Sequence, residues 1–149
     1  MLITRIPETP QEWEQYYQLR YTVLREPWGQ LKGSEVLKDE DQSDHVMVID
    51  DQTHEIVGVA RMQINTPTQG QVRCVAVAPH TQGQGVGKLL MHYLENLAQQ
   101  KGIKEIILDA RENAVKFYLS IGYEIFEESY LLFGAIQHWK MRKDFNVAS

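Results

Sequence analysis

At 149 residues, with 43% hydrophobic and 23% charged residues, the chain has the size and composition of one ordinary globular domain, residues 1–149. A formal net charge of −5 argues against a general nucleic-acid binder, and the single cysteine, Cys74, excludes an intramolecular disulfide and a cysteine-based zinc site. The sequence shows neither the apolar core of a signal peptide nor an apolar run of roughly 20 residues, so we expect a cytoplasmic protein with no membrane partner and no metal.

The N-terminal part of the chain predicts a short strand, a capped helix and a long irregular segment. Residues 2–6 are a strand candidate. Thr9, Pro10 and Glu12 predict a helix start, because threonine and glutamate at this spacing form a capping box and proline suits the first helical position. The apolar stripe of this helix consists of Trp13, Tyr16, Tyr17 and Leu24. Residues 25–44 have no clear period and predict a loop or a broken short helix, and loops of this length often bind ligands.

The middle of the chain predicts three strands. Residues 45–49 and 55–64 are strand candidates that form an antiparallel hairpin. Residues 65–70 have the composition of a loop, and residues 71–77 predict a third strand that ends at Pro79.

The C-terminal half predicts two helices and three strands. The first helix ends at Lys101 and Gly102, which place a cation in the last turn and a glycine at the C-cap. Its apolar face consists of Leu89, Leu90, Leu94, Leu97 and Ala98. The later elements are a buried strand at 106–108, a helix at about 113–121, and strands at 123–128 and near 136–141. This order predicts an α/β protein of the α+β kind, with a mixed sheet and helices on both faces.

One segment carries most of the functional information. Residues 75–88 read Val-Ala-Val-Ala-Pro-His-Thr-Gln-Gly-Gln-Gly-Val-Gly-Lys, which is a strand, a turn and a glycine-rich entry into a helix. Glycines let backbone N–H groups converge, and the positive end of the helix dipole points to the same place, so the segment predicts an anion site suited to a pyrophosphate. A P-loop would need glycine at Gln82 and a hydroxyl residue at Leu89, and a dinucleotide fingerprint would need glycine at Lys88. Both alternatives therefore fail.

Two motifs carry a family resemblance. Gln82-x-x-Gly85-x-Gly87, with Val-Ala-Val-Ala-Pro before it and Lys-Leu-Leu after it, resembles the pyrophosphate-binding signature of the GNAT superfamily of acetyltransferases. Downstream, Asn113 begins the run Asn-Ala-x-x-Phe-Tyr-x-x-x-Gly-Tyr, which resembles the superfamily's helix N-x-x-A-x-x-F-Y-x-x-x-G-F/Y, with its asparagine and alanine closer together. The last predicted strand also looks like that of small bacterial members.

The resemblance implies a GNAT-like fold with a mostly antiparallel sheet, and acetyl-CoA as co-substrate. It implies that the strand backbone pairs with the peptide-like arm of the cofactor and that the turn holds the pyrophosphate. The implied cofactor-binding residues are Val75, Ala76, Val77, Gln82, Gly83, Gln84, Gly85, Val86, Gly87, Lys88, Asn113 and Tyr118. Transfer would be direct, by attack of an amine on the thioester, with Tyr118 as the candidate catalytic acid that protonates the leaving thiolate. The alternative is that Phe117 and Tyr118 only pack the helix.

The sequence leaves the general base and the acceptor open. A primary amine with a pKa of about 10 arrives mostly protonated, so some group must take its proton. The candidate bases are Glu40, His45, Asp109 and His138, or a chain of waters. The candidate acceptor-site residues are Trp28, Glu40, His45 and His138. The acidic run at 35–44 either attracts a cationic acceptor or is a solvated loop, and Arg73 is either a strand-face charge or a contact to acceptor or cofactor.

The expected partner is a small-molecule or peptide amine, with no nucleic acid. A homodimer stays open, because strands near the C-terminus often pair in this superfamily. An alternative function is a non-catalytic acyl-CoA sensor or partner module of the same fold, and another is transfer of a longer acyl chain. Release of CoA with a panel of amines favours an enzyme, whereas cofactor binding without turnover favours the sensor.

Overall fold

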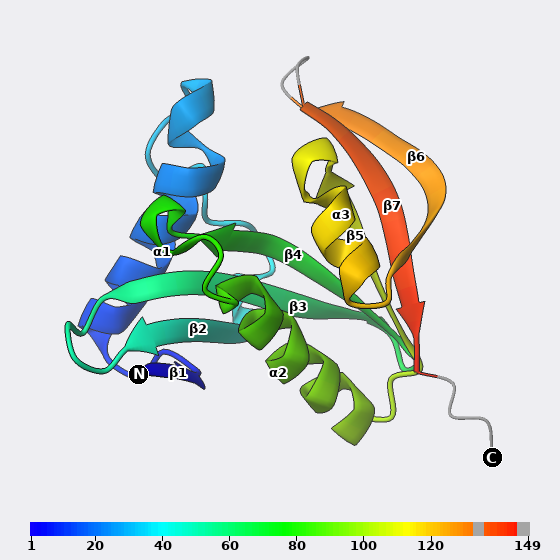
Figure 1. The fold of residues 1–149 in the computed structure, drawn as a ribbon, viewed down its shortest axis with the longest axis horizontal. Coiled ribbons are helices and arrows are strands. Elements are labelled where there is room, and N and C mark those ends of the chain that lie inside the picture. The colour runs from blue at the N-terminus through cyan, green and yellow to red at the C-terminus, as the bar shows by residue number, and fades with distance from the viewer. Residues whose placement is uncertain (133–135, 146–149) are drawn as a thin grey trace.

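The polypeptide builds a central sheet between helices (Figure 1). The computed structural model describes residues 1–132 and 136–145. The strands are β1 (Leu2–Arg5), β2 (Asp44–Asp50), β3 (Ile56–Thr66), β4 (Gln69–Val77), β5 (Glu105–Arg111), β6 (Glu124–Leu132) and β7 (Ile136–Asp144). The helices are α1 (Pro10–Leu24), α2 (Val86–Gln100) and α3 (Val115–Ser120). Short 3₁₀ turns lie at Glu26–Trp28, Glu40–Gln42, Pro79–Thr81 and Glu112–Ala114.

Within these residues the sheet has seven strands in the order β1-β2-β3-β4-β5-β7-β6. Every neighbouring pair is antiparallel except β4 and β5, which run parallel. A parallel pair needs a crossover connection, and α2 supplies it on one face of the sheet. The predicted mixed, mostly antiparallel sheet with helices on both faces is confirmed.

Helices α1 and α2 cover opposite faces of the sheet, each over its own apolar cluster. Alternate residues of β2 divide between the two clusters: Val46 and Val48 face α2, whereas Met47 and Ile49 face α1. All four side chains are buried, which is why this strand is apolar without a break. No helix in the described part of the chain is long and apolar enough to cross a membrane.

The start of α1 is tied to β1. Thr9 Oγ1 accepts the backbone N–H of Glu12 at 3.1 Å, and Glu12 Oε1 accepts the backbone N–H of Thr9 at 3.4 Å, so the predicted capping box is confirmed. Arg5 of β1 adds an ion pair with Glu12 at 2.6 Å. The Arg5 guanidinium lowers the pKa of Glu12 to about 2, so the pair stays charged at neutral pH.

Two expectations about the elements are wrong. Residues 65–70 are not a loop, because β3 and β4 extend into a tight hairpin in which Thr66 Oγ1 accepts two following backbone N–H groups at 3.2 and 3.0 Å. On α2, Leu89 does not belong to the buried face, since 37% of it is exposed, while Val86 and Met91 are buried. The position of the helix axis against β3, which sequence spacing alone does not define, decides which side chains are covered.

Candidate active site

Strands β4 and β5 separate in the middle of the sheet. They pair over four residues of each strand, ending at Val72 and Leu108. Beyond this point β4 stays paired with β3 as far as Val77, and β5 stays paired with β7 as far as Arg111. The edge of β4 that faces β5 after Val72 therefore has no strand partner among the described residues.

A bulge in β4 accompanies this separation. Between the pairs Val59–Ala76 and Arg61–Arg73, β4 has one residue more than β3. Cys74, inside the bulge, has a φ of +58°, a left-handed conformation that is uncommon outside glycine. Because a bulge bends and twists its strand, it turns β4 away from β5.

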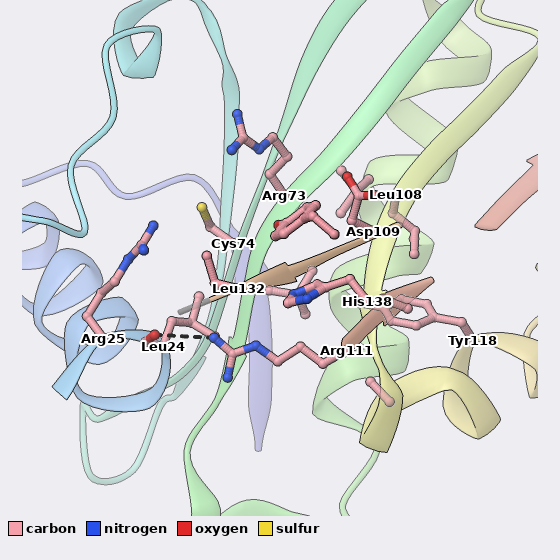
Figure 2. Close-up of a pocket in the computed structure, with 15 residues that line it drawn as sticks. Leu24, Arg25, Arg73, Cys74, Leu108, Asp109, Arg111, Tyr118, Leu132 and His138 are labelled. Carbon is pink, nitrogen blue, oxygen red and sulfur yellow. Dashed lines mark hydrogen bonds between the residues drawn. The ribbon is translucent and has the colours of Figure 1, made fainter. Parts of the chain in front are cut away.

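A pocket of about 140 Å³ lies where the strands part (Figure 2). Its walls come from the C-terminal end of α1, from β4 and β5, from the start of α3, and from β6 and β7. The residues that line this β4–β5 pocket are Leu24, Arg25, Val72, Arg73, Cys74, Val75, Leu108, Asp109, Ala110, Arg111, Ala114, Tyr118, Tyr130, Leu132 and His138. Five residues singled out for the site in the sequence meet here: Arg73, Val75, Asp109, Tyr118 and His138.

The glycine turn, residues 82–87, follows β4 after the short 3₁₀ turn at Pro79–Thr81. Gly83 and Gly85 have φ values of +85° and +80°, and Gly85 caps α2. The first bond of this helix runs from the N–H of Leu89 to the carbonyl of Gly85 at 3.0 Å, and the N–H groups of 85–88 find no acceptor among the described residues. These amides and the helix dipole form a site for an anion.

Two more glycines bring α2 close to its neighbours. A Cβ on Gly58 of β3 would lie 2.4 Å from Val86 Cγ1, so this glycine lets the start of α2 approach the sheet. A Cβ on Gly87 would lie 3.0 Å from the ring of Phe117 in α3. The turn and the helix of Tyr118 are thus packed together.

Tyr118 contributes a buried phenol to the pocket wall. Its ring packs edge-on against Phe117 and Tyr123, with centroids 5.1 and 5.8 Å apart. Its hydroxyl makes no hydrogen bond within residues 1–132 and 136–145. Burial raises the pKa of Tyr118, so the phenol keeps its proton at neutral pH.

His138 contributes a buried imidazole from β7. It stands opposite Arg111 in the β5–β7 register and stacks on Tyr130, with ring centroids 4.5 Å apart. Its Nδ1 lies 3.0 Å from the carbonyl oxygen of Ile136, a contact that assigns the ring proton to Nδ1 and leaves a lone pair on Nε2. Burial, with the charge of Arg111, lowers the pKa of His138 below its ordinary value, so the ring is neutral at pH 7.

The architecture and these motifs agree with a known family. Residues 15–145 match the family model described as Acetyltransferase (GNAT) domain. The chain belongs to the GNAT acetyltransferase family. It is therefore an enzyme, an acyltransferase of the acetyl-CoA-dependent kind. A relative from Bacillus subtilis, the uncharacterized N-acetyltransferase YjcF, is 32% identical over 105 residues, which cover 70% of this chain and 73% of that protein.

Solved structures of N-acetyltransferases share the fold. A putative N-acetyltransferase from Lactobacillus plantarum superposes with a TM-score of 0.83 at 20% identity, covering 97% of this chain and 99% of the other. An aminoglycoside 6′-N-acetyltransferase in complex with coenzyme A superposes with a TM-score of 0.81 at 16% identity, covering 100% and 99%. At such identities the likeness shows the fold, and the acceptor has to be inferred from the pocket of this chain.

The other residues predicted for the site lie around the pocket or away from it. Ala76 packs into the cluster under α1, and Val77 packs against the cluster under α2. Asn113 is exposed in the 3₁₀ turn beside Ala114, which lines the pocket. Trp28 is 40% exposed in the turn after α1 and is not among the lining residues.

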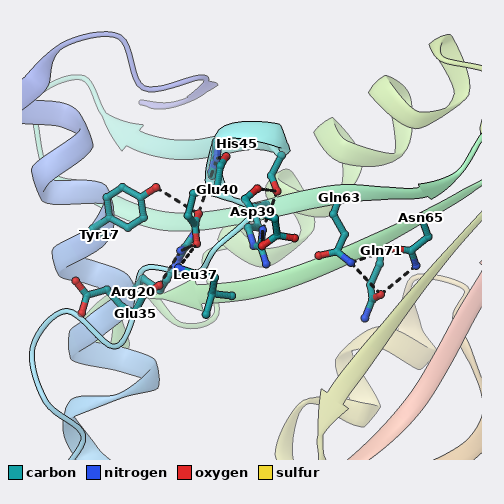
Figure 3. Close-up of polar contacts among 12 residues, drawn as sticks. Tyr17, Arg20, Glu35, Leu37, Asp39, Glu40, His45, Gln63, Asn65 and Gln71 are labelled. Atoms are coloured by element: carbon teal, nitrogen blue, oxygen red, sulfur yellow. Dashed lines mark hydrogen bonds and ion pairs between the residues drawn. The ribbon is translucent and has the colours of Figure 1, made fainter.

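Glu40 and His45 lie in a buried polar network outside the pocket (Figure 3). Glu40 Oε2 accepts from Arg20 at 2.7 Å in an ion pair whose side chains are both almost fully buried. Burial alone would raise the pKa of Glu40, but the Arg20 guanidinium outweighs it and the pKa is lowered. Both ring nitrogens of His45 are engaged, Nδ1 with the Tyr16 hydroxyl at 2.8 Å and Nε2 with the carbonyl of Glu40 at 2.7 Å.

Part of the acidic run packs inward, although Asp41 is exposed. Glu35 and Glu40 are 4% and 6% exposed, and Asp39 pairs with the buried Arg61 at 2.9 Å. Arg20 also donates to the carbonyl oxygen of Glu35 at 2.9 Å. The run lies beside two buried arginines of α1 and β3, which are distant in sequence, so its composition alone is misleading.

Sequence reasoning missed several residues of the pocket wall. Arg111 ends a strand that runs parallel to β4, and the ends of parallel strands are where sites gather, so its position was a usable signal. Tyr130 lies beyond residue 128, where the predicted strand stopped, and nothing in the pattern marks it. Arg25 is the C-cap of α1, and the end of this helix places it at the pocket.

Replacing Glu40 by alanine is expected to lower the free energy of unfolding by about 3–5 kcal/mol, because Arg20 would stay buried without its ionic partner. The control, Glu127→Ala, breaks an exposed ion pair with Lys140 and should change the free energy of unfolding by less than about 1 kcal/mol. Urea titrations followed by circular dichroism measure both values. Because the folded-state pKa of Glu40 is lowered from 4.5, its contribution is complete above about pH 4.5 and is lost as the pH falls further. Equally small effects of the two variants would contradict the role given to this pair.

Proposed function

We propose that this GNAT enzyme transfers the acetyl group of acetyl-CoA directly to an amine that enters the β4–β5 pocket. The observation that carries the proposal is the unpaired edge of β4, which connects the pocket to the glycine turn. An extended ligand with amide groups can add to such an edge, and an anion can bind at the N-terminus of α2. Coenzyme A has both features, an amide-bearing arm and a pyrophosphate.

In this proposal the cofactor binds mainly to the backbone. Val75 and Val77 pair with the amides of the pantetheine arm, and Asn113 contacts the same arm. The N–H groups of Gly83 and of residues 85–88 hold the pyrophosphate, and the charge of Lys88 and the dipole of α2 add to the attraction. An N–H of β4 binds the thioester oxygen and stabilises the negative charge that develops there in the transition state.

The chemical step moves two protons. The lone pair of the amine attacks the thioester carbon, a C–N bond forms, and the C–S bond breaks to release CoA thiolate. The amine proton passes to a base, and the Tyr118 hydroxyl gives its proton to the thiolate sulfur, to be restored from solvent. The raised pKa of Tyr118 keeps the phenol protonated before the reaction, but it also makes the phenol a weaker acid than the thiol, so the proton has to pass within a direct hydrogen bond to the departing sulfur.

Of the four candidate bases, His138 has the best support. It lines the pocket, is neutral at pH 7 and carries a lone pair on Nε2, because its Nδ1 donates to the carbonyl of Ile136. Asp109 also lines the pocket, but its Oδ1 already accepts a hydrogen bond from Ser129 at 2.5 Å. Glu40 and His45 belong to the buried network and have no side chain in the pocket wall.

Acetyl-CoA at 100 times its Kd is expected to stabilise the protein by about 2.7 kcal/mol and to raise its melting temperature by several degrees, whereas ATP and NAD should not. Gly85→Val should abolish the shift, because a side chain at the cap fills the anion site. Gly102→Val is the matched control, since Gly102 has the same φ of +80° and equally open surroundings at the other end of α2. Loss of the shift in both variants, or an equal shift with ATP, would contradict the cofactor site.

His138→Gln is expected to lower kcat roughly 10²- to 10⁴-fold, measured as CoA release with an acceptor from an amine screen. In the wild-type enzyme kcat should fall as the pH drops below the ordinary histidine value of 6.5, because protonated His138 accepts no proton. The variant should lose this acidic limb. His92→Gln, at an exposed position of α2, should change neither value. An unchanged pH profile in His138→Gln would exclude this base, and cofactor binding without turnover would favour a sensor.

A further inference from the structure

The β4–β5 pocket is positively charged in an acidic protein. Arg25, Arg73 and Arg111 all line it, and among its described lining residues Asp109 is the one carboxylate (Figure 2). The whole chain carries a formal charge of −5, so three guanidinium groups around one small pocket are not a consequence of composition. They come from the end of α1, from β4 and from the end of β5, which converge only in the folded protein.

Arg111 is held in the pocket without an opposite charge. Its guanidinium is half-buried and donates from Nη2 to the backbone carbonyl of Leu24 at 3.2 Å, and it forms no ion pair with the part of the chain that the structure describes. Burial, followed by the charge of Arg25, lowers its pKa. Partly burying a guanidinium without an opposite charge costs desolvation free energy, and a bound anion beside Arg111 would offset this cost.

Arg73 stands on the bulged part of β4, on the same pocket. Its side chain is exposed and forms neither a hydrogen bond nor an ion pair with the described residues. Asp39, an acidic group that feels the charge of Arg73, is already committed to Arg61 at 2.9 Å. The hydrogen-bond donors of the Arg73 guanidinium are therefore available to a ligand. A guanidinium can bind a carboxylate or a phosphate through two parallel hydrogen bonds.

We propose that the acceptor amine carries an anionic group, a carboxylate or a phosphate, and that Arg111 and Arg73 bind this group with the charge of Arg25 in support. The inference rests on the proposed transfer reaction, because it assigns the pocket to the acceptor. His138 faces Arg111 in the strand register, so an anion on Arg111 brings the amine close to the proposed base. Polycationic amines are repelled by these arginines, and Glu40 and Asp39 of the acidic run are already paired with Arg20 and Arg61.

The test compares amines that differ by one anionic group: glycine with glycinamide, and O-phosphoethanolamine with ethanolamine, with spermidine as the cationic member. We expect kcat/KM to be roughly 10- to 100-fold higher for one or both anionic members than for their neutral partners. The pair with the larger ratio tells whether the group is a carboxylate or a phosphate.

Two arginine variants test which residues are responsible. Arg111→Gln and Arg73→Gln should each reduce this preference mainly through the acceptor KM, with the Kd of acetyl-CoA unchanged. Arg142→Gln removes an exposed arginine of β7 that pairs with Glu124, and it should keep the preference. Melting temperatures of the three variants establish that they are folded.

A readout independent of turnover comes from Cys74, which lines the same pocket and is the only cysteine of the chain. The rate at which iodoacetamide alkylates Cys74 can be measured by mass spectrometry. With CoA present during alkylation, N-acetylglycine should slow this rate more than N-acetylglycinamide does. Arg111→Gln should remove this difference.

The outcomes separate the two levels of the account. Three results would contradict the anionic acceptor: equal kcat/KM within both amine pairs, a higher kcat/KM for spermidine, or arginine variants that raise the Kd of acetyl-CoA instead of the acceptor KM. None of these results would contradict acetyl transfer itself. Two other results would contradict the transfer proposal and the inference that rests on it. One is the absence of acetyl-CoA binding; the other is acetyl-CoA binding without turnover of any amine, with equal protection of Cys74 by both probes.

Discussion

The separation of β4 from β5 after Val72 is the constraint on which the site depends. Strands that stayed paired would use the backbone groups of this edge among themselves and would close the pocket. The flanking pairs, β3 with β4 and β5 with β7, continue past this point and keep both walls in place. The glycine turn follows β4 at the end where the strands part, so an open strand edge and an anion site become neighbours through chain connectivity alone.

The charges of the chain fall into two groups with different consequences. The acidic residues Asp39 and Glu40 turn inward onto Arg61 and Arg20, and this buried network holds the segment after α1 against the sheet. A buried pair adds little net stability but is costly to break, so its effect is to fix where that segment lies. The third guanidinium of the pocket is that of Arg25, the C-cap of α1.

The sequence predicts those features that depend on neighbours along the chain. Three local features were predicted correctly: the capping box of Thr9, the glycine after α2 and the glycine turn. Each depends on nearby residues alone, because it either satisfies free backbone groups at a helix end or places a glycine where φ is positive. The bulge was not predicted, because the residue with the left-handed φ is Cys74, a type that gives no such signal. Arg111 and His138 come together through the strand register, and Glu40 pairs with Arg20 through the placement of α1. The periodicity of the sequence specifies neither.

The most direct test of the account is a ¹H–¹⁵N NMR titration of the protein with coenzyme A, which reports on each backbone amide separately. The account predicts the largest shift changes at the amides of the glycine turn, Gly83 and 85–88, and along the open edge of β4 at Val75 and Val77. Changes confined to the network around Glu40, or spread over the outer strands β6 and β7 with the turn unaffected, would contradict the claim that the opening between β4 and β5 is the cofactor site.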